Sequence, residues 1–451
     1  METQNQQRSL KASLVAPAVW VGLFAAIYLA VLPMADTIAL RNTALLGLLL
    51  CLAWQFPKIR AELRFGLPVL LWAAYLFIFP LIADDHVVAW HSLGGQWGKG
   101  LLAMLAGAGV AALLSRRMGA AVFYLGAVSA IPLLVHLVLF AWKAGVTGAM
   151  PWGYWGRETH HADLGYAAGH VTILMAAAIV AADRKFRPWA IAFIMAALLS
   201  TALARSRAGL AFAVLGVFLV FVPAYLAQAT RHRRHVLAGL TTLMLAVSAL
   251  AAFAVKDDYR WRNMATQISA GFLGNPIQIE CEGTASVESD IVSKFGAGEL
   301  SNSVINSIRD GDGARMVALR AGMELVVKYP WGSDGSRQGF EKLLRRECPS
   351  PAISMAHAHN GWIDTLLAIG WIGAFLYLWL LIYFCEQGVT NLRNERTLNE
   401  WGLVLIALSL FWIIRGLTDS VFRDHMLEMQ GFVFTFALVA LQGKNMQFKR
   451  S

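Results

Sequence analysis

The sequence predicts an all-α polytopic membrane protein, with about twelve transmembrane helices and one long polar segment between them. Of its 451 residues, 57% are hydrophobic and only 15% are charged, whereas soluble chains carry roughly 25% charged residues. Apolar runs of about 18–25 residues, the length that crosses a hydrocarbon core, recur along the chain. These runs lack the alternation of polar and apolar residues that marks membrane β-strands.

The predicted transmembrane segments follow one another closely, with a single long interruption. They are residues 13–33, 37–56, 66–83, 98–115, 118–142, 163–182, 187–204, 208–228, 235–255, 360–384, 400–418 and 424–442. The first has no convincing small-residue cleavage site after it, so we expect an uncleaved helix rather than a signal peptide. The chain therefore divides into membrane helices over 1–255, a polar segment over 256–358 and further membrane helices over 359–451.

Basic residues alternate with the apolar runs and predict the orientation. Every second connection between apolar runs is basic, and so are both ends of the chain. The basic residues of these segments include Arg8, Lys11, Lys58, Arg60, Arg64, Arg116, Arg117, Arg184, Lys185, Arg187, Arg231, Arg233, Arg234, Arg393, Arg396, Lys444, Lys449 and Arg450. Because Lys and Arg collect in cytoplasmic loops, both termini are expected in the cytoplasm of a bacterium, with residues 256–358 in the periplasm. The net charge of +10 then reflects orientation in the inner membrane and predicts no nucleic-acid partner.

The polar segment is expected to form a partly helical cap over the membrane helices rather than an independent domain. Gly311-Asp312-Gly313 predicts a turn, and an amphipathic helix is expected over residues 314–329, ended by Pro330. Its apolar face is predicted from Met316, Leu319, Met323, Val326 and Val327.

Two of the four cysteines, Cys281 and Cys348, fall in this outer segment. In an oxidising compartment they are candidates for a disulfide, and the alternative is two unpaired thiols. Cys51 and Cys385 fall in or beside apolar runs and are expected to be buried apolar side chains.

Arginines on the outer side are candidate phosphate ligands, because a guanidinium stays charged and grips two oxygens. Arg205 and Arg207 lie in an outer turn where the orientation rule disfavours basic residues, although both side chains can also snorkel to lipid headgroups. Arg315 and Arg320 belong to the expected cap helix, where a solvated helix face is the alternative. Arg415, at the last outer turn, is expected to pair with a nearby acid such as Asp419, although phosphate binding stays open.

His357 and His359 lie where the outer segment re-enters the membrane, beside Asn360. An imidazole with a pKa near ~6.5 can accept a proton at neutral pH. The pair also suggests a metal site, but no acidic cluster accompanies it, so a general base is the better interpretation.

Several motifs, taken in order, resemble the family of O-antigen ligases and O-antigen polymerases. A Ser-Arg turn precedes an apolar run, an Arg-containing helix ends at Pro-x-Gly after a long outer segment, and His-Asn leads into a run with Gly-x-x-Gly. These are Ser206-Arg207-Ala208-Gly209; Arg315 with Pro330-Trp331-Gly332; His359-Asn360-Gly361-Trp362; and Gly370-Trp371-Ile372-Gly373. Judged by these motifs, the resemblance extends over roughly the second half of the chain. Judged by the number of predicted transmembrane segments, it extends over the whole chain. Gly332-Ser333-Asp334-Gly335 departs from the Gly-Val-Gly turn that is frequent in the family.

The resemblance implies an inverting glycosyltransferase of the polytopic GT-C type, without cofactor or metal, whose site faces the periplasm. Its donor would be a polysaccharide on undecaprenyl diphosphate and its acceptor lipid A-core, both reached among membrane lipids. His359 would be the general base, and Arg207 and Arg315, helped by Arg205, would bind the diphosphate. Further candidates are His357, Asn360, Arg320, Arg157 and Arg415.

Two other functions stay open. An O-antigen polymerase or a protein O-oligosaccharyltransferase would use the same donor. A basic outer surface that could contact the phosphates of the lipopolysaccharide core favours the ligase. This surface is predicted from Arg157, Arg260, Arg262, Arg337, Arg345 and Arg346. A transporter of lipid-linked glycans would carry ionisable residues deep in its spans, and few are found there.

Overall fold

The computed structural model is all-helical across the residues that it describes. These are residues 2–115, 120–156, 161–181, 183–227, 241, 264–353, 355–394, 399–419 and 424–448. The helices are α1 (Glu2–Val31), α2 (Ile38–Ile59), α3 (Leu67–Ile82), α4 (His86–Ser92), η1 (Leu93–Trp97), α5 (Gly98–Val110), η2 (Ala111–Ser115), α6 (Ala121–Ser129), α7 (Ile131–Thr147), α8 (His161–Ala181), η3 (Arg184–Phe186), α9 (Arg187–Leu203), α10 (Arg207–Ala227), α12 (Met264–Ala270), α13 (Pro276–Glu282), η5 (Thr284–Val287), α14 (Glu288–Phe295), α15 (Glu299–Asp310), α16 (Asp312–Lys328), α17 (Gly339–Glu347), α18 (Gly361–Asn394), α19 (Glu400–Gly416) and α20 (Asp424–Phe448).

Eight helical stretches of the described chain are long and apolar enough to cross a membrane, as expected of a polytopic membrane protein. They are Ile38–Ile59, His86–Leu114, Ala121–Thr147, Asp163–Ala181, Arg184–Leu203, Arg207–Ala227, Gly361–Arg393 and His425–Gly443, and each overlaps one predicted segment. Large apolar side chains such as Leu50, Trp54 and Leu226 are exposed on them, which suits contact with lipid rather than water.

The remaining predicted segments differ in length or position. Residues 13–33 and 66–83 contain the shorter apolar helices Pro17–Val31 and Leu67–Ile82. Residues 400–418 correspond to α19, which is almost entirely buried among other helices. The predicted segment 235–255 lies outside the described residues, apart from residue 241.

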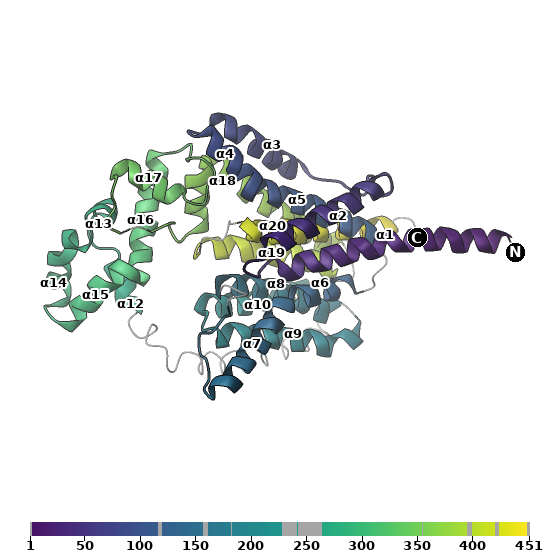
Figure 1. The fold of residues 1–451 in the computed structure, drawn as a ribbon, viewed down its shortest axis with the longest axis horizontal. Coiled ribbons are helices and arrows are strands. Elements are labelled where there is room, and N and C mark those ends of the chain that lie inside the picture. Colours follow the sequence, from purple (N-terminus) through teal and green to yellow (C-terminus); the bar gives the residue numbers. More distant parts are fainter. Residues whose placement is uncertain are drawn as a thin grey trace.

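The membrane helices form one bundle whose core is continuous from α1 to α20. α8 packs between α9 and α10, α5 packs on α20, and α18 packs on α19. Residues 264–358, which contain α12 to α17, lie at one end of this bundle, whereas α1 begins and α20 ends toward the opposite end (Figure 1). We call residues 264–358 the cap.

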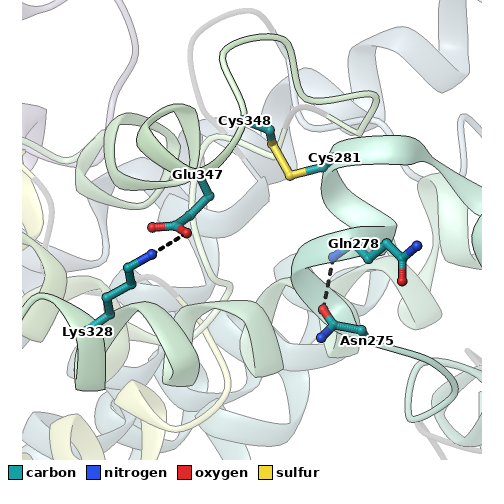
Figure 2. Close-up of a disulfide and its surroundings, with 6 residues drawn as sticks. All are labelled: Asn275, Gln278, Cys281, Lys328, Glu347 and Cys348. Atoms are coloured by element: carbon teal, nitrogen blue, oxygen red, sulfur yellow. Dashed lines mark hydrogen bonds and ion pairs between the residues drawn. A yellow bond between two sulfur atoms is a disulfide. The ribbon is translucent and has the colours of Figure 1, made fainter.

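A disulfide closes the cap on itself. Cys281, at the end of α13, is bonded to Cys348, just after α17, and the pair is separated by 67 residues in the sequence (Figure 2). One apolar cluster of the cap joins α16 and α17 to Leu367 of α18, so the cap shares its core with a membrane helix. The cap is therefore packed onto α18 of the bundle.

The Pro-x-Gly and Gly-x-x-Gly motifs dock on each other at this junction. Gly332 and Gly370 have φ angles of +78° and +72°, and a β-carbon on Gly332 would lie 2.4 Å from the Gly370 nitrogen. α18 is kinked at Gly370, and the carbonyl of Ala368 accepts hydrogen bonds from the N–H groups of Ser333 and Gly335. The Gly-Ser-Asp-Gly turn thus satisfies a carbonyl that the kink releases.

The helix predicted over residues 314–329 is present as α16, but its predicted apolar face is only partly buried: Val326 is buried as expected, and Met316 and Leu319 are half-buried. Met323 and Val327 are exposed, whereas Ala314, Ala318 and Ala321 are buried together with Gly322 and Leu325. A β-carbon on Gly322 would lie 2.6 Å from Ile363 and 2.9 Å from Ala358. The small residues form the buried face because they let α16 approach the start of α18 closely.

Candidate active site

A cavity of about 700 Å³ lies where the cap meets α10 and the segment before α18. It is within the ~300–1,000 Å³ range of pockets that enclose organic ligands. Its walls are Arg207, Gln267, Glu299, Asn302, Ser303, Asn306, Ser307, Gly311, Asp312, Arg315, Met355 and His359. Three residues selected from the sequence, Arg207, Arg315 and His359, therefore surround one space although the first and last are about 150 positions apart.

Two guanidinium groups meet at one carboxylate in this cavity. Arg207 is the first residue of α10, and its Nη2 lies 3.3 Å from Oδ2 and 3.4 Å from Oδ1 of Asp312. Asp312 opens α16, and its Oδ1 also lies 3.4 Å from Nη1 of Arg315, one turn further along. The Arg207 and Asp312 side chains are mostly buried, whereas that of Arg315 is about half exposed. Asp312 thus holds both cations at one wall of the cavity.

The two histidine rings are in contact, with centroids 4.2 Å apart, and His359 lines the cavity. His359 has φ +53°, a left-handed conformation that is uncommon outside glycine. Neighbouring contacts hold it: the Ala358 N–H donates to Asp364 Oδ1 at 2.8 Å, and Ala358 itself is fully buried. A residue kept in a strained conformation by its surroundings is a common feature of functional sites.

Asn360 positions this segment rather than lining the cavity. Its Oδ1 accepts hydrogen bonds from the N–H groups of Trp362 and Ile363, both at 3.0 Å, and so caps the start of α18. Its Nδ2 donates to the Leu417 carbonyl at 3.0 Å. Asn360 therefore fixes the chain next to His359 to the ends of two membrane helices.

Three of the other candidate arginines, Arg205, Arg320 and Arg415, do not line the cavity. The guanidinium of Arg205 lies 5.7 Å from the ring centre of Trp152, whereas Arg207 turns toward Asp312. Arg320 donates to the carbonyls of Gly271, Leu273 and Gly274 and thereby ties α16 to the turn after α12.

Arg415 is buried and lies beneath the start of α10. It donates to the Ala208 carbonyl at 3.2 Å, and its Nη2 lies 3.4 Å from Asp419 Oδ2. Its guanidinium also lies 4.4 Å from the ring centre of Tyr166. The pairing with Asp419 agrees with the interpretation favoured from the sequence, and the bond to Ala208 supports the residue next to Arg207.

Part of the expected basic surface is neutralised by neighbours. Arg345 pairs with Glu341 at 2.9 Å, and Arg346 pairs with Asp84 at 2.9 Å, which links the cap to the loop before α4. Arg157, Arg260 and Arg262 lie outside the described residues. No group of three or more His, Cys, Asp or Glu side chains that suits a metal ion occurs within the described ranges.

Sequence reasoning missed several cavity residues. Asp312 was interpreted only as part of a turn, although an acidic residue at a helix start between two arginines is a detectable signal. Glu299, Asn302, Ser303 and Asn306 were also missed, although their spacing of three and four residues places them on one helix face.

The cavity offers cationic groups, a candidate base and neutral hydrogen-bonding groups around one space. This arrangement suits a substrate that carries both phosphate and hydroxyl groups. In comparisons with known proteins, no family model matches the chain, and no curated protein matches it.

Proposed function

We propose that this protein is an inverting membrane glycosyltransferase that uses a saccharide on undecaprenyl diphosphate as its donor. The observation that carries the proposal is the shared cavity of Arg207, Arg315 and His359. The resemblance to O-antigen ligases and polymerases adds the substrate class, because the motifs that contain these residues resemble those of that family.

In the proposed reaction, a sugar hydroxyl of the acceptor attacks the anomeric carbon of the donor. The bond from that carbon to the diphosphate oxygen breaks, its electron pair leaves with the diphosphate, and the configuration inverts. His359 takes the hydroxyl proton, and such general-base help contributes about 10²–10⁴ in rate. Arg207 and Arg315 stabilise the charge that grows on the leaving diphosphate, without a metal ion.

We further propose a GT-C-type arrangement of about twelve membrane helices, with the cap in the periplasm and both termini in the cytoplasm. The alternation of basic connections along the sequence supports this orientation. The cap also lies at the end of the bundle away from the start of α1 and the end of α20 (Figure 1). The cavity would then be reached from the outer leaflet, where lipid-linked donors and lipid A-core are anchored.

The proposed acceptor is lipid A-core, which makes the protein an O-antigen ligase of the bacterial inner membrane. The test is transfer in detergent by purified protein, with undecaprenyl-diphosphate-linked polysaccharide as donor and either lipid A-core or a second lipid-linked glycan as acceptor. Product on lipid A-core alone supports the ligase. Elongation of the second lipid-linked glycan would indicate a polymerase, and transfer to neither acceptor would contradict both.

The same assay tests the metal-free reaction and the transport alternative. Transfer should proceed in the presence of a chelator, and restoration by a divalent ion after loss in chelator would contradict the metal-free proposal. Turnover in detergent requires no gradient, so it would exclude transport as the main activity.

A further inference from the structure

The cavity has a second wall of different chemistry, formed by one face of α15. Asn302, Ser303 and Asn306 follow Glu299 by three, four and seven residues, the spacing of one helix face, and all four line the cavity. On the other side of the helix, Val304 and Ile308 are fully buried in the apolar core of the cap. The helix is therefore anchored by its apolar side and presents its polar side to the cavity.

The hydrogen-bonding capacity of this face is available. Within the described part of the chain, the side chains of Asn302, Ser303 and Asn306 form no hydrogen bond with another residue, and Asn302 and Asn306 are exposed. An amide offers two donors and an acceptor, and a hydroxyl offers one donor and two acceptors. This set complements the hydroxyl groups of a sugar ring, each of which also donates and accepts.

Charge separates the two walls. Arg207 and Arg315 carry two positive charges against the single carboxylate of Asp312, so their wall keeps a net positive charge. The α15 face carries no cation and one carboxylate, that of Glu299. A carboxylate repels a phosphate group but accepts hydrogen bonds from neutral hydroxyls. These charges would orient a ligand that has phosphate at one end and sugar at the other, with its sugar toward α15.

We propose that the α15 face formed by Glu299, Asn302, Ser303 and Asn306 is a saccharide subsite that binds the hydroxyl groups of a neutral pyranose. The proposal rests on the proposed function for the identity of the substrates. The sugar belongs either to the donor glycan or to the acceptor core, and the chemistry of the face is the same for both.

The test uses the full-length protein with Asn302→Ala and Asn306→Ala combined. Loss of two or more hydrogen bonds should weaken saccharide binding about tenfold or more. Two direct binding measurements, which need no turnover, separate the sources: isolated core oligosaccharide, and undecaprenyl diphosphate with and without its glycan. Weaker binding of the core oligosaccharide assigns the face to the acceptor, and loss of the extra affinity due to the glycan assigns it to the donor.

The matched control is Ser289→Ala with Ser293→Ala, two exposed residues of the neighbouring helix α14 that do not line the cavity. It should bind both saccharides as the unaltered protein does. Asn302→Leu with Asn306→Leu keeps the approximate side-chain size, removes every hydrogen-bonding group of these two side chains and should also weaken binding. Affinities within twofold of the unaltered protein for both saccharides, in both double variants, would overturn the subsite. An unaltered protein that binds saccharide but transfers none would instead contradict the proposed function.

Discussion

The guanidinium of Arg207 and the carboxylate of Asp312 lie 3.3 Å apart and join a membrane helix to the cap. Arg207 opens α10 and Asp312 opens α16, so the contact fixes the start of one helix against the start of the other. Because Asp312 also contacts Arg315, one carboxylate orients both candidate phosphate ligands. Such orientation before the reaction is what makes electrostatic stabilisation effective.

Asp312→Ala is expected to lower kcat about tenfold or more, because Arg207 and Arg315 lose the group that holds them. The KM for donor should not rise, because the variant also removes a negative charge near the diphosphate. Steady-state kinetics at varied donor concentration measure both kcat and the KM for donor. Glu324→Ala, an exposed residue of α16 that does not line the cavity, is the control. An unchanged kcat would show that Asp312 does not position these arginines.

His359→Ala is expected to reduce transfer about 10²–10⁴-fold while insertion and donor binding persist, since only the proton acceptor is lost. His357→Ala is the matched variant, because its ring lies against that of His359. It should retain more activity, since His357 does not line the cavity. The rate of single-turnover transfer at saturating donor is measured for both variants. A larger loss of rate in His357→Ala than in His359→Ala would assign the general base to His357.

Arg207→Lys and Arg315→Lys are each expected to lower kcat/KM for donor about tenfold or more, because both side chains contact the diphosphate and stabilise the charge that grows on it. Lysine keeps the charge but loses the planar fork that grips two phosphate oxygens. The measurement is initial rate against donor concentration. Arg309→Lys, on the exposed surface of α15 and outside the cavity, should behave as the unaltered protein does. Full rescue by lysine would show that these positions supply charge alone.

Cys281→Ser is expected to lower the stability of the cap by about 4 kcal/mol, because the disulfide closes a loop of this length in the unfolded chain. Thermal unfolding under non-reducing conditions measures the loss. Cys51→Ser and Cys385→Ser remove thiols that are not disulfide-bonded and serve as controls. Labelling of both Cys281 and Cys348 by a thiol reagent in the untreated protein would contradict the bridge.

Burial raises the pKa of the Glu280 carboxyl from 4.5 to about 8, and neither of its oxygens has a hydrogen-bond partner among the described residues. Below about pH 4.5 the group is neutral in the folded and unfolded chains. Between about pH 4.5 and 8 only the unfolded chain releases the proton, so stability falls as pH rises.

Glu280→Gln should remove this pH dependence and stabilise the cap at neutral pH by an amount on the order of a few kcal/mol. Unfolding temperature measured across this pH range is the readout. Glu282→Gln, an exposed neighbour, should keep the original pH profile. If unfolding temperature depended on pH in the same way for Glu280→Gln and the unaltered protein, Glu280 would ionise in the folded protein as it does in the unfolded chain.

Much of the architecture is encoded locally. Apolar runs and their length predict the membrane helices, and Pro330 marks the end of α16 just after Lys328. The pairing of Cys281 with Cys348 was a candidate because only these two cysteines fall in the outer segment. The basic turn marked Arg207, and the polar boundary marked the pair His357 and His359. The resemblance to O-antigen ligases and polymerases then favoured Arg315 and chose His359 over His357.

Which of the selected side chains share a space depends on how distant segments of the chain pack together. Arg205 and Arg207 are two residues apart, but the turn at Arg205, with φ +50°, sends one toward Trp152 and the other toward Asp312. The buried face of α16 follows the close approach of Gly322 to Ala358, which hydrophobic periodicity alone does not encode. Composition and periodicity act along the chain, whereas a cavity wall depends on contacts between distant segments, and those form only when the cap packs onto the bundle.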